Sequence, residues 1–285
     1  MQFTKFSSES WVILSGIEQQ IKEKIEKIGT PLKDWDIQIN YGIKTGFNDA
    51  FIIDGVKRKE LITEDPKSEQ IIRPLLRGRD IKRYSYEFAD LYLITTFPSL
   101  KIDIEHYPAV KQHLMSFGYD RLKQTGDTGA RKKTNNQWFE TQDSISYWED
   151  FYKQKIVWKI IGDQMAFMID SKKNIVNNAC YILTGNGLEY LLAVLNSRII
   201  KWYSYQTNMN KTGVGDMQVG AQNVLLFPIP KLSIQEQKKY IDLVAKITEG
   251  KEKNEITINF EKEIENNVYQ LYGLTHEEIE FIELQ

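Results

Sequence analysis

The sequence predicts an α+β (mixed α/β) fold, in which mostly antiparallel strands lie between a helix at one end of the chain and helices at the other. Apolar residues recur at three- and four-residue steps over residues 8–28, the period of an amphipathic helix. Short apolar runs separated by polar turns follow, which is typical of strands. The helical period returns after residue 231. We therefore expect a helix within 1–30, a strand-rich body over 31–231 and a helical region over 232–285.

The strands of the body are predicted from alternation and from short apolar runs. Residues 35–41 alternate between apolar and polar side chains, as in a half-buried strand. Further strands are expected at 51–54, 91–95, 155–161, 165–170, 179–184 and 224–230. The strand at 51–54 is expected to return from the first strand through the Asn48–Asp49 turn. The strands at 165–170 and 179–184 are expected to pair around the Ser171–Asn174 turn.

The helices are predicted from periodicity and from capping residues. The first helix is expected to end at Gly29 and Pro31. Further helices are expected at 66–76, 187–205, 233–249 and 255–272, with a last short one after Thr275. Ser233 is followed by Glu236, the spacing of a capping box, and Thr275 with Glu278 repeats it. Residues 113–138 have no periodicity and predict a long exposed loop, and residues 207–220 predict a second polar loop.

Composition indicates a globular chain that is soluble, cytoplasmic and not bound to a membrane. Of its 285 residues 41% are hydrophobic, enough for a sizeable core. The single cysteine, Cys180, lies in an apolar run and is expected to be inert core. No apolar run approaches the length of a membrane span. Residues 249–285 carry ten Glu and three Lys, so the rest of the chain has an excess of five basic side chains.

Motifs for catalysis or metal binding are not found in the sequence. The three histidines are not paired at metal-ligand spacing, and there is no CxxC, GxSxG, GxxxxGK[ST] or GxGxxG. Glu236 with Lys238, and Glu249 with Lys251, have the Glu-x-Lys spacing of some nucleases, but the first pair lies on a predicted helix and the second at a helix end, and both are interpreted as solvated surface. An independent nuclease with an unrecognised site and a non-DNA protein-interaction module stay open as alternatives.

Basic residues on turns and loops are the positive signal for function. Lysine and arginine neutralise phosphates, and the arginine fork fits guanine edges. The candidate DNA-binding residues are Lys44, Thr45, Arg73, Arg77, Arg79, Lys82, Arg83, Arg121, Lys123, Arg131, Lys132, Lys133 and Lys211. Their alternative is ordinary solvated surface. Trp202, Tyr203 and Tyr205 could stack on bases, but at the end of an apolar helix a core position is favoured.

An ordered series of segments resembles a known family. These segments read GIKTGFNDAFII, IIRPLLRGRDIKRY, LYLITT, NNQWFE, KQKIVWKII, NNACYIL, LEYLLAVLNSRIIKWY and LLFPIPKLSIQEQ, and they cover about 40–240. Together they resemble the TaqI-like C-terminal specificity domain, the target-recognition domain of type IIG restriction–modification enzymes and adenine-N6 DNA methyltransferases. The first helix is similar to the connector after the methyltransferase domain, and VYQLYGLTHEEI is similar to the helical spacers of type I specificity subunits.

The resemblance implies sequence-specific recognition of double-stranded DNA without catalysis by this chain. Such enzymes carry an NPPY-like motif and a Gly-rich cofactor loop, and this sequence has neither. Base flipping and methyl transfer would therefore belong to a partner methyltransferase domain or subunit, with or without a nuclease. S-adenosylmethionine and Mg²⁺ are expected only in those catalytic domains, and no cofactor is expected in this chain.

Overall fold

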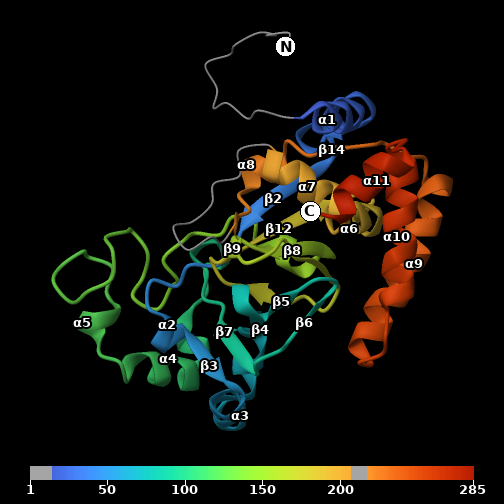
Figure 1. Cartoon of the computed structure of the whole chain (residues 1–285). Coiled ribbons are helices and arrows are strands. Elements are labelled where there is room, and N and C mark those ends of the chain that lie inside the picture. The colour runs from blue at the N-terminus through green and yellow to red at the C-terminus, as the bar shows by residue number, and fades with distance from the viewer. Residues whose placement is uncertain (1–14, 207–216) are drawn as a thin grey trace. The chain divides into compact units, whose positions relative to one another are not determined.

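The computed structural model describes residues 15–206 and 217–285, which divide into two compact units (Figure 1). The helical unit comprises Met1–Trp35, Gly162–Met165 and Glu189–Gln285. The sheet unit comprises Asp36–Ile161 and Ala166–Leu188. The domain borders that the sequence suggests at residues 30 and 231 stay predictions. The chain combines helices with mostly antiparallel sheets, so the α+β fold class is confirmed.

Two four-stranded sheets form the sheet unit. Its strands are β2 (Ile37–Tyr41), β3 (Ile52–Asp54), β4 (Ile72–Leu76), β5 (Ile81–Lys82), β6 (Ser85–Tyr86), β7 (Leu91–Ile94), β8 (Lys155–Lys159), β9 (Ile161–Gly162), β10 (Phe167–Asp170), β11 (Ile175–Val176) and β12 (Cys180–Gly185). The first sheet has the order β10-β8-β12-β2 and is antiparallel throughout. The second has the order β11-β4-β7-β3, in which only the β11–β4 pair is parallel.

Strand pairing differs from the sequence-based expectation in two places. β3 does not return along β2 but pairs with β7, where Ile53 lies opposite Tyr92. β10 and β12 do not pair with each other, because each lies on one side of β8. β8 is buried over Lys155–Trp158, so both of its faces are covered and it takes an interior position in the sheet. The expected hairpin is therefore wrong.

Short helices complete the sheet unit. They are α2 (Asn48–Phe51), α3 (Gly55–Glu64), α4 (Pro108–Met115) and α5 (Tyr119–Leu122). The predicted helix at 66–76 is wrong: Pro66 opens one 3₁₀ turn that ends at Gln70, and the apolar residues from Ile72 form β4 instead. One core connects both sheets, with buried Ile53 and Leu93 from one and Val157 and Ile182 from the other. Cys180 also lies in this core, so its interpretation as buried is confirmed.

A buried ion pair fixes the turn after β10. The Lys155 ammonium, fully buried, donates to Asp170 Oδ2 at 2.5 Å and to the Phe151 carbonyl at 2.7 Å. Asp170 also accepts from the Asn174 main-chain N–H at 2.9 Å. Burial lowers the pKa of Lys155, and Asp170 opposes that effect. The pair thus orders the segment that leads into β11 and then into the turn at Asn177.

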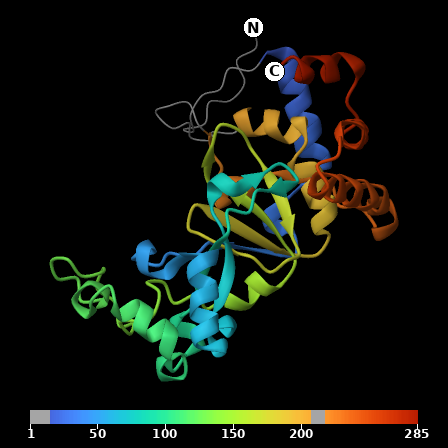
Figure 2. The same ribbon diagram turned by 90° about the horizontal axis from the view of Figure 1, so that it is seen from below.

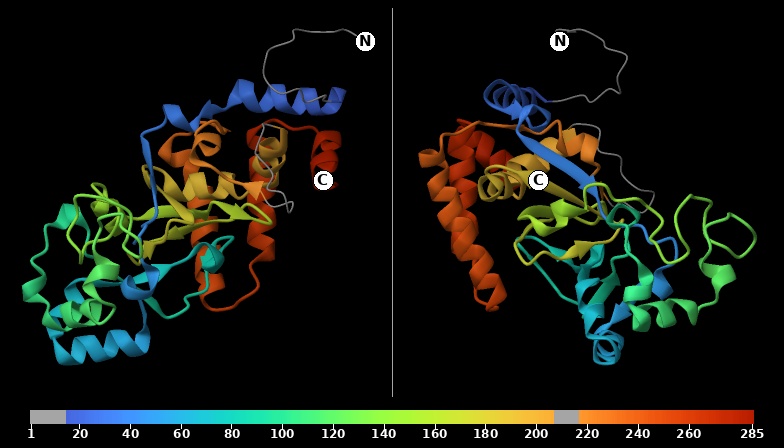
Figure 3. Two further views of the ribbon diagram at one scale, coloured as in Figure 1. Left: turned by 90° about the vertical axis from the view of Figure 1, so that its left-hand side faces the viewer. Right: turned by 180° about the vertical axis from the view of Figure 1, so that it is seen from behind.

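The helical unit gathers both ends of the described chain (Figure 3). Its elements are α1 (Gly16–Ile28), β1 (Thr30–Pro31), α6 (Leu188–Leu195), α7 (Arg198–Gln206), β13 (Met217–Gln218), α8 (Ala221–Val224), β14 (Pro228–Ile229), α9 (Ile234–Glu252), α10 (Ile258–Leu271) and α11 (His276–Glu283). The capping boxes predicted at Ser233 and Thr275 are confirmed, and Ser15 with Glu18 adds one at α1. α9 and α10 run side by side (Figure 2), where the Tyr240 hydroxyl donates to the Asn267 carbonyl at 3.1 Å.

Two predicted elements of the helical unit are broken by local chemistry. The helix expected at 187–205 is interrupted at Ser197, whose hydroxyl donates to the Val194 carbonyl at 2.6 Å. The strand expected at 224–230 contributes only β14, because Pro228 and Pro230 lack the N–H that a ladder requires. The two proline carbonyls are still used: the Tyr272 hydroxyl donates to that of Pro228, and the Tyr190 hydroxyl to that of Pro230, both at 2.7 Å.

The aromatic residues at the end of α7 are mostly core. Trp202 is 4% exposed and Tyr203 5% exposed, and the Tyr203 hydroxyl donates to Glu26 at 3.0 Å. The core interpretation is therefore confirmed for both, whereas Tyr205 is 42% exposed. Over residues 15–206 and 217–285, no helix combines the length and the apolar character needed to cross a membrane.

Candidate nucleic-acid interface

The turn after β2 contains an exposed lysine, Lys44, and a buried threonine, Thr45. Lys44 is exposed, whereas Thr45 is 2% exposed. The Thr45 hydroxyl donates to Asn48 Oδ1 at 2.7 Å and accepts from the Phe47 N–H at 3.1 Å. Both bonds lie within the turn that leads into α2. Thr45 therefore shapes the turn, and its predicted role as a direct DNA contact is wrong for the hydroxyl as placed.

Gly42 brings this turn against a second one. Its N–H donates to the Cys180 carbonyl at 2.9 Å, and a Cβ at this position would overlap the Asn177 carbonyl oxygen. Ile43 continues the contact, because its carbonyl accepts from the Asn178 N–H at 3.0 Å. Only glycine permits so close an approach of two main chains. Lys44 is thereby fixed beside the exposed Asn177–Ala179 turn.

The two arginines of the RGRD segment, Arg77–Asp80, lie in different environments, although both are predicted to contact DNA. Arg77 donates to both carboxylate oxygens of Asp80, at 2.8 and 3.0 Å, and Asp80 raises the pKa of Arg77 further. Arg79, in contrast, is exposed. Gly78 packs against Ala179, with 3.2 Å between the Ala179 Cβ and an added Cβ. Arg79 is thus the cation available to an external anion, and the expected direct contact by Arg77 is not supported.

The remaining bases of this cluster are partly occupied. Arg73 lies over the Tyr152 ring at 5.7 Å, and Arg83 over the Tyr84 ring at 4.9 Å. Lys82 lies 3.6 Å from Glu87 at an exposed position. An exposed pair of this kind is weak and can exchange for a phosphate. The three can still supply positive charge, but none is held free for a ligand in the way that Arg79 is.

The loop after α4 is ordered rather than open. The Gln124 side-chain amide donates to the Gln137 carbonyl at 3.0 Å, and the Asn136 amide donates to those of Thr141 and Gln142 at 3.1 and 2.9 Å. Arg121 stacks over the Phe47 ring at 4.5 Å, and Lys123 pairs with Asp120 at 3.0 Å. The predicted long loop is confirmed over residues 123–138, which contain no helix or strand and are exposed at many positions, whereas α4 and α5 occupy the start of the predicted range.

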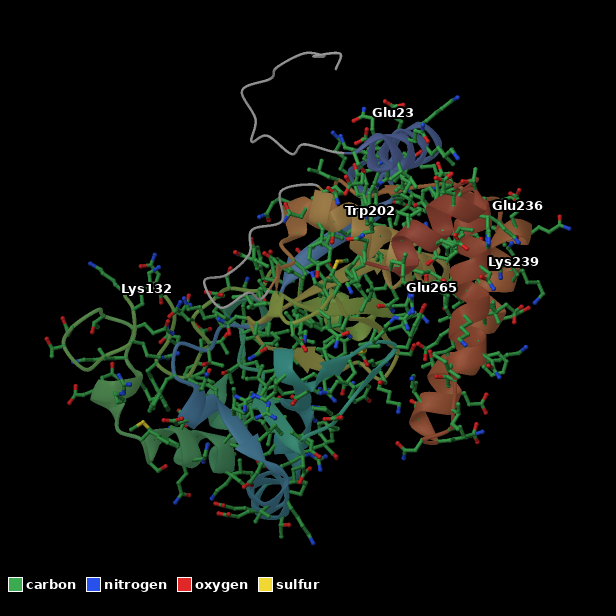
Figure 4. The ribbon with its side chains drawn as sticks, viewed as in Figure 1. Glu23, Lys132, Trp202, Glu236, Lys239 and Glu265 are labelled. Carbon is green, nitrogen blue, oxygen red and sulfur yellow. The ribbon has the colours of Figure 1, made fainter. Side chains whose placement is uncertain are left out.

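Arg131 is the largest departure from the sequence-based expectation. It is 2% exposed, and its guanidinium donates to main-chain carbonyls at 2.6–3.0 Å. Burial lowers its pKa to about 10. It cannot contact DNA from this position. The next two residues, Lys132 and Lys133, are exposed, and the side chain of Lys132 points away from the ribbon (Figure 4).

These contacts bring exposed cations from three distant segments onto adjoining turns. Arg131 bonds to Thr45, the neighbour of Lys44, and the Gly42 and Gly78 contacts place the Asn177–Ala179 turn between Lys44 and Arg79. Among the described residues, the cations without an ion-pair partner on these turns are Lys44, Arg79, Lys132 and Lys133. We name these four residues the basic turn cluster.

Sequence reasoning missed one residue of this surface and could not place others. Asn178 is exposed between Lys44 and Arg79, and the Asn-Asn-Ala turn signal was available in the sequence. Lys211 and its neighbours Asn208, Asn210 and Thr212 lie outside the described residues. An exposed asparagine amide can donate to and accept from an adenine edge.

The Glu-x-Lys residues make capping and ion-pair contacts within the helical unit. Glu236 caps α9 through Ser233, and this hydrogen bonding lowers its pKa. Lys238 pairs with Asp242 at 3.1 Å, and Lys251 with Glu261 at 2.9 Å. Within 15–206 and 217–285, no group of three or more His, Cys, Asp or Glu side chains is placed to hold a metal ion.

The fold and the basic turns together define a recognition module: sheets that hold cation-bearing turns. The family model of the TaqI-like C-terminal specificity domain matches residues 73–229. The chain belongs to this family, and the resemblance drawn from the sequence is confirmed. The match includes Arg79, Lys132 and Lys133, whereas Lys44 precedes it. No curated protein matches the chain.

Solved structures of two restriction enzymes share the fold. The type IIL restriction–modification enzyme MmeI, solved in complex with DNA, is 13% identical with a TM-score of 0.57, and the match covers 90% of this chain and 37% of that one. The type IIG restriction endonuclease BpuSI is also 13% identical, with a TM-score of 0.52 over 80% of this chain and 27% of that one. This chain therefore spans well under half the length of either enzyme.

Proposed function

We propose that the chain is the DNA-recognition part of a restriction–modification enzyme and binds double-stranded DNA through the basic turn cluster. The observation that carries this proposal is the contact of three distant segments that leaves Lys44, Arg79, Lys132 and Lys133 exposed on adjoining turns. Membership of a specificity-domain family supports it, as does the fold shared with MmeI, whose structure holds DNA.

In this proposal the chain makes two kinds of contact with the duplex, to phosphates and to base edges. The lysines neutralise phosphates, which sets position and gives affinity that falls with salt. Arg79 can present its fork to guanine O6 and N7, and Asn178 can read an adenine edge. Each such base contact supplies roughly 1–3 kcal/mol of discrimination.

Chemistry on the DNA belongs to other domains in this proposal. A methyltransferase domain or subunit would bind S-adenosylmethionine, flip the adenine and transfer the methyl group, and a nuclease would use Mg²⁺. The shares of 37% and 27% of the two related enzymes leave room for such domains outside this segment. The chain itself would be non-catalytic.

Binding to a pool of random duplexes as a function of salt tests the proposal. The logarithm of the affinity should fall linearly with the logarithm of the salt concentration, and repeated selection should enrich a short sequence. Replacing the basic turn cluster by alanine should lower the slope by about 3–4, near 0.9 per phosphate contact. Lys238→Ala with Lys253→Ala is the control, because both are exposed lysines of α9 and its C-cap, outside the sheet unit. A flat salt dependence, or an equal loss in the control, would refute DNA recognition.

A further inference from the structure

Arg131 is a buried cation on a loop whose next two residues are exposed lysines. Its Nε donates to the Leu122 carbonyl at 2.7 Å, and Nη2 donates to that of Trp138 at 2.6 Å. Nη1 donates to the carbonyls of Thr45, at 3.0 Å, and Glu140, at 2.7 Å. The guanidinium therefore ends on main chain and not on a carboxylate.

These four bonds join three segments. Leu122 closes α5, where the loop leaves the helices, and Trp138 and Glu140 lie on its returning arm. Thr45 lies on the turn after β2, 86 residues before Arg131 in the chain. The planar fork of arginine can reach carbonyls in several directions at once, which a lysine ammonium on a flexible stem does not reproduce. One side chain thus sets the position of the loop against the turn.

The loop keeps other anchors that do not involve Arg131. The Gln142 N–H also donates to the Thr45 carbonyl, at 3.1 Å, and the Gln124 amide also donates to the Glu140 carbonyl, at 3.1 Å. The Thr96 hydroxyl holds the Phe139 carbonyl at 2.6 Å. Loss of the guanidinium should therefore loosen the loop locally while the core of the sheet unit stays folded.

The charge of Arg131 is retained at neutral pH. Burial lowers its pKa only to about 10, and Glu140 opposes the shift. The carbonyl dipoles compensate the charge, so a neutral replacement of similar length loses both the charge and the fork. An apolar side chain could fill this position without the cost of burying a charge, but it could not bond to the carbonyls of three segments.

We infer that Arg131 is a positioning residue for DNA recognition: without touching DNA, it fixes Lys132 and Lys133 relative to Lys44. This inference rests on the proposed function. On a loosened loop, Lys132 and Lys133 can still contact phosphates, but their positions relative to Lys44 are no longer fixed. Discrimination between sequences should suffer more than affinity for DNA in general.

The test compares Arg131→Gln and Arg131→Lys with Lys132→Gln in the full chain. For the duplex enriched by selection and for random duplex, we would measure affinity, the salt slope and hydrogen exchange of residues 122–142. Arg131→Gln should lower the preference for the selected duplex by about tenfold or more, speed exchange in the loop and leave the salt slope on random DNA unchanged. Arg131→Lys should lie between. Lys132→Gln should instead lower the slope by about 0.9 with exchange unchanged.

Each outcome decides between the two ideas. If the unaltered chain shows no salt-dependent binding, the proposed function fails and the inference with it. If that chain binds and discriminates, and the Arg131 variants discriminate equally well, only the positioning role fails. Loss of cooperative unfolding in both Arg131 variants would make the residue a general stabiliser and would overturn the positioning role as well.

Discussion

Single substitutions of Arg79 and Arg77 should have different effects, because Arg79 is the proposed DNA contact and Arg77 is bonded to Asp80. Arg79→Ala removes an exposed cation that has no ion-pair partner among the described residues. It should lower the salt slope of duplex binding by about 0.9, so that the affinity lost between about 50 and 200 mM salt shrinks by about 3.5-fold. Arg77→Ala removes a charge that Asp80 already neutralises at 2.8 Å, so the slope should stay the same.

The two variants should show the opposite order in stability. Arg77→Ala leaves the Asp80 side chain, 5% exposed, with the main-chain N–H of residue 77 but without the guanidinium. The Arg77 side chain is 26% exposed, so breaking this pair should cost less than breaking a fully buried one. We expect Arg77→Ala to lower the free energy of unfolding by about 1–3 kcal/mol. Arg79→Ala should change stability by less than about 0.5 kcal/mol.

Fluorescence anisotropy of a labelled duplex across a salt series measures the slopes, and urea unfolding measures the stabilities. Arg79→Lys is the control that keeps the charge, so it should keep the slope but lose preference at a guanine. If Arg77→Ala lowers the slope as much as Arg79→Ala, Arg77 leaves Asp80 to bind phosphate and the reasoning fails. An unchanged slope for Arg79→Ala would remove it from the interface.

Three further predictions concern the frame that carries the interface. Asp170→Ala leaves the fully buried Lys155 ammonium without its carboxylate and should cost about 3–5 kcal/mol in urea unfolding, against under about 1 kcal/mol for the exposed pair with Asp242 broken by Lys238→Ala. Gly42→Ala should destabilise the sheet unit and weaken DNA binding, because its Cβ would overlap a carbonyl of the neighbouring turn, whereas Gly16→Ala meets no atom within 4 Å and should be neutral; equal melting temperatures would contradict this. Burial raises the pKa of Cys180 to about 12 and keeps the thiol protonated at pH 8; alkylation should be slow until denaturant is added, and rapid labelling of the folded chain would contradict its core position.

Local signals in the sequence were enough for the capped helices near the two ends of the chain and for the class of protein. The capping boxes at Ser233 and Thr275 are satisfied within three residues, so a short window of sequence contains the whole interaction. The segments that resemble the specificity-domain family were equally legible without coordinates, and the family match confirms the resemblance over residues 73–229. The bond between Arg77 and Asp80, also three residues apart, could have been foreseen from the same spacing.

Strand partners and the roles of individual cations depend on contacts between residues far apart in the chain. Alternation predicts that a strand has two faces but not which strand lies beside it. The position of β8 between β10 and β12 therefore could not be predicted from the sequence. Arg131 and Lys132 are adjacent basic residues, yet one is buried and the other exposed. Only the folded chain places carbonyls of Leu122, Trp138 and Thr45 around a single guanidinium. The sequence by itself thus determined the capped helices near the two ends of the chain, the family and the basic character of the turns, because those depend on residues close together in the chain. The tertiary structure decided which cations face outward, because burial depends on what the rest of the chain brings alongside.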